Sequence, residues 1–204
     1  LSQSQINSKP LAECAQFISG FTWGAIYSAD ITLGNQVASS VPIQVIDPAY
    51  SQIPAACTVG STPMNTLATL GANGILGIGS FQQDCSTCAS SAIAAHYYEC
   101  SANPCTSVVV PLNLQVTNPV AMLSSNNNGV VINLPSVAST GQTSAAGTLL
   151  LGIDTTTANA ITTETVFKLD QYGYLTTTYA GRTYTQSYID SGSNGIFFRD
   201  NSIA

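Results

Sequence analysis

The chain has 204 residues, of which only 7% are charged, and its formal net charge is −6 with a pI near 4.2. A charged share this far below the usual value of about 25% excludes a solvated helical bundle and a coiled coil. The negative charge excludes a nucleic-acid partner, because phosphates would be repelled. Hydrophobic residues make up 45%, which is enough for one large β domain or two small ones.

Short runs of β-branched and apolar residues, each closed by turn residues, predict an all-β fold. The first two strands are expected at residues 25–33, before Gly34-Asn35, and at residues 41–46, before Asp47-Pro48. Further strands are expected at residues 108–110, 120–123, 130–134, 148–153 and 163–169.

A hairpin is expected near the end of the chain. Alternating Tyr and Thr residues at 172–179 and 182–189 suit paired strands, and Ala180-Gly181 suits the turn between them. One helix is expected at residues 90–98, with Ser90 or Ser91 as its N-cap. No apolar run approaches the roughly 18 residues that cross a bilayer, so no membrane span is expected.

Six cysteines and a Ser/Thr-rich, weakly charged composition favour a secreted or cell-envelope protein over a cytosolic one. The short spacings favour local disulfides within two pairs, which leaves a third pair to close a long loop. The expected bridges are Cys85–Cys88, Cys100–Cys105 and Cys14–Cys57.

Two other interpretations of these cysteines remain open. The C-x2-C pair Cys85 and Cys88, followed by His96, Cys100 and Cys105, offers the ligand types of a zinc knuckle. The same C-S-T-C pair also has the spacing of a redox-active dithiol. Structural disulfides are favoured, so no metal or other cofactor is expected, and His96 is expected to be a surface residue.

The segment Asp190-Ser-Gly-Ser193 is the best candidate for chemistry. A strand that delivers Asp-Ser-Gly into a tight turn places a carboxylate where backbone N–H groups and hydroxyls can keep it ionised. On its own the motif is also that of an ordinary turn, in which the Asp caps its own backbone.

Other segments, in the same order along the chain, resemble the pepsin-like aspartic peptidases, in particular a branch of exported bacterial proteins. Gln16-Phe-Ile-Ser-Gly-Phe-Thr-Trp-Gly24 is similar to the flap hairpin Q-Y-G-x-G-S-x-x-G, and residues 29–34 match its return strand. Asn73-Gly-Ile-Leu-Gly-Ile-Gly79 is similar to D-G-I-L-G-L-G, an apolar strand beneath the active site of the first lobe. Residues 120–129 and 147–154 resemble the strands that join the lobes, and Asp190-Ser-Gly-Ser193 matches the D-T-G-T of the second lobe.

The resemblance implies pepsin-like β-barrel lobes in a partial bilobal arrangement. Residues 1–153 would be the flap-bearing remainder of the first lobe with the interlobe strands, and residues 154–204 the beginning of the second lobe. It also implies peptide-bond hydrolysis by two carboxyl groups that share a proton, without metal or organic cofactor. Asp190 would be catalytic, and an extended peptide substrate would contact Phe17, Ser19, Gly20, Gly192 and Ser193.

The chain departs from the family pattern at several positions. It has one D-[ST]-G motif and no Asp before the flap segment, so the first catalytic Asp is expected outside these residues. Phe17 and Ile18 stand where the family has Tyr and Gly, and Asn73 stands where it has Asp. Trp23 is expected to pack at the base of the flap.

The activity of the chain therefore stays open at this stage. Its expected partner is the remainder of the same polypeptide or a complementary chain, which would cover open sheet edges. The alternative is a noncatalytic β-rich module, secreted or at the cell surface, with a structural or binding role.

Overall fold

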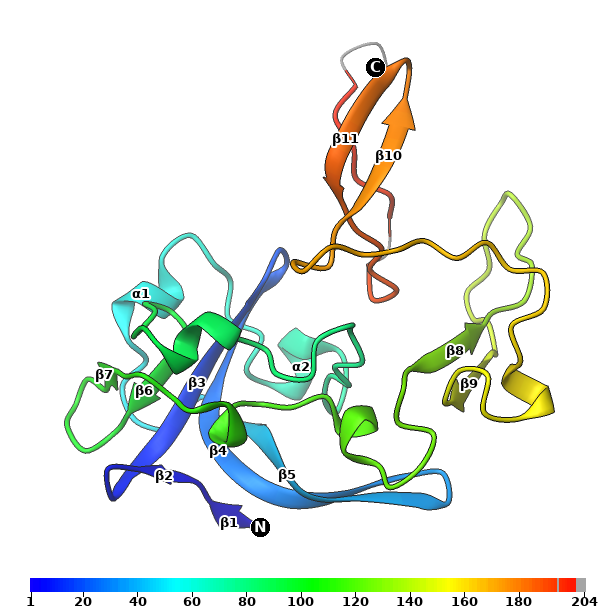
Figure 1. Ribbon diagram of the computed structural model, residues 1–204. Helices are drawn as coiled ribbons and strands as arrows, with labels where there is room; N and C mark the ends of the chain where they lie inside the picture. The colour runs from blue at the N-terminus through cyan, green and yellow to red at the C-terminus, as the bar shows by residue number, and fades with distance from the viewer. Residues whose placement is uncertain (194, 201–204) are drawn as a thin grey trace. The chain divides into compact units, whose positions relative to one another are not determined.

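The computed structural model describes residues 1–193 and 195–200, and the chain divides into two compact units, Leu1–Ile161 and Thr162–Ala204 (Figure 1). The boundary falls eight residues after the one expected from the sequence, because η4 (Thr157–Asn159) packs back onto β9. The assignment of the two parts to pepsin-like lobes stays a prediction. Each unit is described below by itself.

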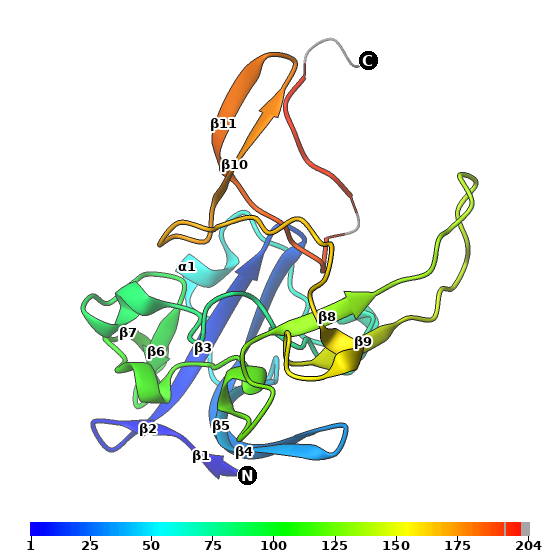
Figure 2. The same ribbon diagram turned by 45° about the vertical axis from the view of Figure 1, so that its right-hand side comes forward.

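An antiparallel sheet of seven strands organises the first unit (Figures 1 and 2). Its central path runs β1-β4-β3-β6-β7, while β2 pairs with β3 and β5 pairs with β4. The strands are β1 (Ser2–Gln3), β2 (Gln5–Ile6), β3 (Lys9–Phe17), β4 (Gly20–Leu33), β5 (Gln36–Ile46), β6 (Tyr97–Glu99) and β7 (Thr106–Ser107).

Two tight hairpins set the register of the three long strands. Phe17 pairs with Gly20, so Ile18 and Ser19 form the turn between β3 and β4. Leu33 pairs with Gln36, so Gly34 and Asn35 form the turn between β4 and β5, as the sequence predicted. Two-residue turns of this kind fix which side chains face each side of the sheet.

Both faces of the sheet carry hydrophobic clusters, because neighbouring residues of a strand point to opposite faces. Ala12 of β3 belongs to a cluster with Trp23 and Tyr98, named here the Trp23 cluster. Leu11 belongs to a cluster on the other face with Tyr97 and Cys88, named here the Tyr97 cluster. Successive residues of β3 and of β6 are therefore buried in two different clusters, one on each face of the sheet.

Trp23 is fully buried, as its expected packing role requires. Its indole Nε1–H donates to the Tyr50 carbonyl at 2.6 Å, and its ring meets the Tyr98 ring edge to face at 5.5 Å between centroids. An indole that buries its ring and satisfies its one donor is a strong anchor for a core.

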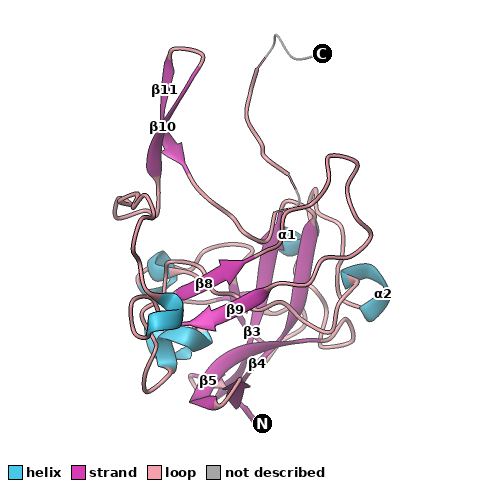
Figure 3. Ribbon diagram, turned by 90° about the vertical axis from the view of Figure 1, so that its right-hand side faces the viewer, coloured by secondary structure: helices cyan, strands magenta, loops and turns pink. Residues whose placement is uncertain are grey.

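The rest of the first unit consists of short elements (Figure 3). Residues Val130–Asn133 (β8) pair with Thr148–Leu151 (β9), which confirms two of the expected strands. The helical segments are α1 (Ala55–Thr58), α2 (Leu67–Leu70), η1 (Ser86–Ala89), η2 (Leu112–Leu114), η3 (Pro119–Met122) and η4. Over the described residues, no helix is both long and apolar enough for a bilayer crossing.

The second unit contains the expected hairpin, formed by β10 (Leu175–Tyr179) and β11 (Arg182–Ser187). Tyr179 pairs with Arg182, so Ala180 and Gly181 make the turn, and both have positive φ angles, 48° and 76°. Leu175 is the one buried hydrophobic residue that the structure describes in this unit.

Several expected elements are absent from the described residues. The helix expected at residues 90–98 is wrong: Tyr97 and Tyr98 belong to β6, because the pairing with β3 buries both rings on opposite faces. The strand expected at residues 120–123 is wrong, since Asn118 caps a 3₁₀ turn that Pro119 begins. Residues 73–79, 108–110 and 163–169 form no strand, because no neighbouring strand pairs with them.

Candidate functional site

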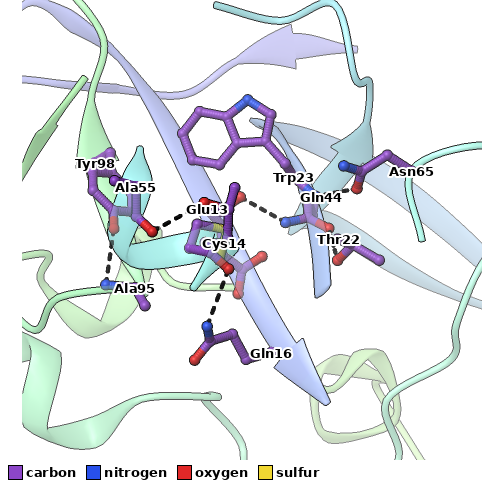
Figure 4. The surroundings of a disulfide bond; sticks show 12 residues. Glu13, Cys14, Gln16, Thr22, Trp23, Gln44, Ala55, Asn65, Ala95 and Tyr98 are labelled. Atoms are coloured by element: carbon purple, nitrogen blue, oxygen red, sulfur yellow. Dashed lines mark hydrogen bonds between the residues drawn. A yellow bond between two sulfur atoms is a disulfide. The ribbon is translucent and has the colours of Figure 1, made fainter. Parts of the chain in front are cut away.

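All three expected disulfides are formed, Cys14–Cys57, Cys85–Cys88 and Cys100–Cys105. Cys14 and Cys57 lie in the Trp23 cluster, and Figure 4 shows Cys14 on β3 beside Trp23 and Tyr98. The Gln16 amide donates to the Cys57 carbonyl at 3.2 Å, which adds a second link between β3 and α1. This disulfide therefore fixes the strand that leads into the β3–β4 hairpin.

Asp190 lies in a tight turn after β11. Its Oδ1 accepts the Gly192 backbone N–H at 2.9 Å, and its Oδ2 accepts the Ser193 hydroxyl at 2.8 Å. The Ser193 hydroxyl and then the Gly192 N–H stabilise the charged carboxylate, which lowers the pKa of Asp190 below its usual value of 3.8. The turn therefore presents an exposed, ionised carboxylate.

The β3–β4 hairpin corresponds to the flap-like segment of the sequence. Phe17 and Ile18 are exposed at its tip, with 42% and 88% of their surface accessible. The Ser19 hydroxyl contacts the Met64 sulfur at 3.5 Å, and the Phe21 N–H donates to the Thr62 carbonyl at 2.9 Å. The apolar tip is thus held against residues 62–64 from one side.

Gly20 and Gly24 occupy the two positions where this hairpin has no room for a side chain. A Cβ at Gly20 would lie 2.2 Å from the Thr62 carbonyl oxygen, and one at Gly24 would lie 1.8 Å from the Val45 carbonyl oxygen. Backbone approaches this close require glycine. Close backbone packing therefore explains why the flap-like motif has glycine at these two positions in this chain.

The expected site residues fall into two sets. Gly192 and Ser193 contact Asp190 directly in the second unit. Phe17, Ser19 and Gly20 lie together on the β3–β4 hairpin of the first unit. The residues within each set lie close together. That the two sets form one substrate-binding site stays a prediction.

A second group of ionisable residues, which sequence reasoning missed, lies on the Tyr97 face of the sheet. Glu13 is only 2% exposed, and its carboxyl group is hydrogen-bonded to the carboxyl group of Asp84. Burial, then this hydrogen bond and the Asp84 charge, raise the pKa of Glu13 well above its usual range. Glu13 therefore carries the proton of the pair, which it donates to Asp84.

Asp84 is the ionised member of this pair. Burial alone would raise its pKa, but the nearby His96 imidazole and hydrogen bonds from Glu13 and Tyr97 outweigh burial and lower it. The Tyr97 hydroxyl donates to Asp84 Oδ1 at 2.6 Å and accepts the Val116 backbone N–H at 2.7 Å. Burial among these groups raises the pKa of Tyr97, so the phenol stays protonated.

His96, which the sequence predicted to be a surface residue, is partly exposed and contacts buried groups. Its side chain is 29% exposed, and its Nε2 lies 3.7 Å from Asp84 Oδ2. Its carbonyl accepts the Cys14 N–H at 2.7 Å, which ties the loop before β6 to β3. His96 also lies beside the sulfur atoms of Cys85 and Cys88, within 4.8 Å.

The four-ligand zinc knuckle considered from the sequence does not form as such. Cys100 and Cys105 bridge to each other, and Cys105 belongs to the Trp23 cluster on the opposite face from Cys88. Among the described residues, the group that could hold a metal ion is Cys85, Cys88 and His96.

The sequence could have predicted one half of the buried pair of Glu13 and Asp84. Glu13 stands two residues after Leu11, among apolar residues, and residues two apart in a strand point to the same face. Once β3 is known to be a strand, Glu13 is therefore predicted to point inward with Leu11. Nothing in the sequence linked it to Asp84, because the two meet only after the segment before β6 folds onto β3.

These features define the class of the protein as an all-β, disulfide-bonded chain with an exposed Asp-Ser-Gly turn and a buried carboxyl pair. A family model described as "Protein of unknown function (DUF3443)" matches residues 1–204, and the chain belongs to that family. Comparison with curated proteins and with solved structures finds no match.

Proposed function

We propose that this chain is part of an exported pepsin-like aspartic peptidase, in which Asp190 supplies one of the two catalytic carboxyl groups. The observation that carries the proposal is the geometry at Asp190. A carboxylate exposed to solvent and kept ionised by one backbone N–H and one hydroxyl is suited to act as the base of a carboxyl pair. The second carboxyl group would come from outside these 204 residues.

The hairpin of β3 and β4 supports the same proposal. It has the length, the exposed tip and the obligatory glycines of a flap that covers an extended peptide. A peptide bound as a strand would take backbone hydrogen bonds from such a hairpin and side-chain contacts from Phe17. Gly192 and Ser193 would hold Asp190 in place, and Ser19 and Gly20 would lie beside the substrate backbone.

The proposed chemistry needs only carboxyl groups and water. Two carboxyl groups close together share one proton, since both cannot ionise at that distance. The ionised member removes a proton from water as the water attacks the scissile carbonyl, and the protonated member donates to the carbonyl oxygen. Asp190, with its lowered pKa, suits the ionised role.

The three disulfides and the sparse charge support export, since disulfides persist outside the cytosol. We place the protein in the extracellular space or the cell envelope. One observation favours a noncatalytic module instead: Phe17 lacks the hydroxyl group that the family carries on its flap.

Cleavage of an unfolded protein between about pH 3 and 6 by the full-length gene product tests the proposal. Asp190→Asn should lower the rate at least about a hundredfold, because an amide cannot accept the proton. Asp170→Asn is the matched control, since Asp170 is also an exposed turn residue of the second unit that accepts two backbone N–H groups. Equal rates for Asp190→Asn and the wild type would exclude the proposed role, and no cleavage by the wild type would favour the noncatalytic module.

A further inference from the structure

The proposed peptidase chemistry makes no use of the residues around the Cys85–Cys88 disulfide. Both cysteines lie in the Tyr97 cluster, with Cys88 fully buried and Cys85 only slightly accessible. Their sulfur atoms and a ring nitrogen of His96 all lie within 4.8 Å of one another. The bridge therefore has two sulfurs and one imidazole close together, which are the ligand types that zinc takes in proteins.

We propose that Cys85, Cys88 and His96 form a redox-gated zinc site, closed as a disulfide under oxidising conditions and able to bind one divalent zinc ion after reduction. The inference is independent of the proposed peptidase function. Zinc takes thiolate and imidazole ligands in a tetrahedral arrangement, and C-x2-C is a frequent spacing for two of them.

The distances fit such a site. In a tetrahedral zinc site the ligand atoms lie about 3.5–3.9 Å apart, as the Zn–S and Zn–N bond lengths require. The two sulfurs are bonded to each other in the oxidised chain, so reduction must let them move apart to this separation. The His96 ring nitrogen, which is within 4.8 Å of both sulfurs, would have to approach them by about 1 Å. The fourth position would hold water, which can reach the site because the His96 side chain is part-exposed.

His96 has a carboxylate beside its ring, as histidines that bind zinc usually do. A ligating histidine commonly turns its second ring nitrogen to a carboxylate, which sets the ring orientation and raises its basicity. His96 Nε2 faces Asp84 Oδ2 at 3.7 Å, which leaves Nδ1 for the metal. Asp84 is itself held by the Tyr97 hydroxyl and by Glu13.

The cysteines have supporting contacts too. The Thr87 hydroxyl lies 3.6 Å from the Cys85 sulfur, where it can donate to a thiolate. Two backbone hydrogen bonds hold Cys88: its carbonyl accepts the Val110 N–H at 2.9 Å, and its N–H donates to the Cys85 carbonyl at 3.0 Å. These bonds do not involve sulfur, so the loop can keep its shape after reduction.

The reduction step requires a two-electron reductant, and a dithiol is one. The two thiols of a dithiol give two electrons and two protons to the Cys85–Cys88 bond, which breaks into two thiols while the reductant closes to a disulfide. A phosphine gives the same two cysteine thiols, with the two protons coming from water as the phosphine becomes its oxide. Each cysteine thiol then releases its proton to water as its sulfur binds Zn²⁺. In the oxidised chain the sulfurs are bonded to each other and offer no thiolate.

Zinc binding to the whole chain, before and after mild phosphine reduction, tests the site. We expect about one zinc ion per reduced chain and none in the oxidised chain. Cobalt in place of zinc should give a thiolate-to-metal charge-transfer band. His96→Ala should weaken zinc binding more than Asp84→Asn, for which a loss of about 10- to 100-fold is expected.

The Cys100→Ser/Cys105→Ser variant is the matched control, because this bridge has no histidine partner among the described residues. It should bind zinc as the wild type does. Equal zinc affinity in His96→Ala and the wild type would overturn the proposal, since any free pair of thiols would then account for the binding.

A second measurement does not depend on the reduced fold being fully retained. When the reductant is removed in the presence of zinc, Cys85 and Cys88 should stay open to alkylation while Cys14–Cys57 and Cys100–Cys105 reoxidise. Reoxidation of all three pairs at the same rate, with and without zinc, would contradict the site.

Discussion

The two units of the chain differ in what holds them together. The first, Leu1–Ile161, has three hydrophobic clusters, two of them on opposite faces of one sheet, and all three disulfides. The second, Thr162–Ala204, has a single hairpin and one buried hydrophobic residue among those described, Leu175. Isolated hairpins are at best marginally stable in water.

This difference bears on function. The proposed catalytic carboxylate, Asp190, belongs to the weakly packed unit, whereas the flap-like hairpin belongs to the strongly packed one. Large apolar side chains of the second unit are exposed, for example Ile189 and Phe197 at 78% and 70%. Exposed apolar surface of this kind is typical of interaction sites.

Loss of the Cys14–Cys57 disulfide should lower the stability of the first unit more than any other change predicted below. The bridge spans 43 residues, so removing it as Cys14→Ser/Cys57→Ser should destabilise the first unit by about 4 kcal/mol on loop-closure entropy. Urea unfolding followed by the fluorescence of Trp23, the one tryptophan of the chain, reports on this unit alone.

The matched control for that disulfide is Cys100→Ser/Cys105→Ser. This bridge spans only 5 residues, and the same relation gives a loss of about 2 kcal/mol. Equal losses for the two variants would show that loop length does not set the stability of this unit.

Gly20→Ala should weaken the flap-like hairpin. The added Cβ would meet the Thr62 carbonyl oxygen at 2.2 Å, and overpacking of this kind costs about 1–3 kcal/mol. Gly77→Ala is the control, since a Cβ there meets no atom within 4 Å. Urea unfolding of both variants by Trp23 fluorescence checks the prediction, and a Gly20→Ala variant as stable as Gly77→Ala would contradict it.

The stability of the first unit should depend on pH through Glu13. Burial raises the pKa of this carboxyl above its usual value of 4.5, so its contribution is complete below pH 4.5 and is lost as the pH rises through the folded pKa. Glu13→Gln keeps a neutral donor toward Asp84 and should remove this loss. Urea midpoints measured by Trp23 fluorescence from pH 4 upward should therefore fall less in the variant than in the wild type.

Asp190→Asn is the control for that pH series. The pKa of Asp190 is lowered by the Ser193 hydroxyl and the Gly192 N–H, so its contribution has the opposite sign and is lost as the pH falls. Because Asp190 lies in the other unit, its variant should leave the Trp23 profile unchanged. A Glu13→Gln profile parallel to that of the wild type would exclude a protonated Glu13.

The smallest predicted effect lies in the second unit. Ala180 has a φ of 48°, a conformation that Asn adopts more readily, and Asn-Gly is the preferred pair for such a turn. Ala180→Asn should stabilise the β10–β11 hairpin by about 0.5–1 kcal/mol and slow its amide hydrogen exchange about two- to fivefold. Faster exchange in β10 and β11, or a change in Trp23 unfolding, would contradict this.

Local sequence signals predicted the local parts of the fold. Gly34-Asn35 and Ala180-Gly181 marked their turns correctly, because turn conformation depends on the residues in the turn itself. The short spacings of Cys85–Cys88 and Cys100–Cys105 likewise predicted their bridges, which left Cys14 to pair with Cys57.

Parts that depend on distant pairing were not predictable in this way. Tyr97 and Tyr98 resembled the end of a helix and became a strand because β3 pairs with them. Residues 163–169 have the composition of a strand but pair with no strand in the part of the chain that the structure describes. The Asp190 turn could be predicted from its motif, whereas the Glu13–Asp84–His96 group could not, because it joins β3 to a loop far along the chain.

The central claim is that Asp190 forms half of a proton-sharing carboxyl pair, and binding of a statine-type inhibitor tests it most directly. Such compounds resemble the tetrahedral intermediate, and analogues of this kind bind at least about a hundredfold tighter than substrates. Calorimetry on the full-length gene product at acidic pH should show binding that Asp190→Asn weakens at least about a hundredfold and Asp170→Asn leaves intact. No binding by the wild type, or equal binding by Asp190→Asn, would contradict the account.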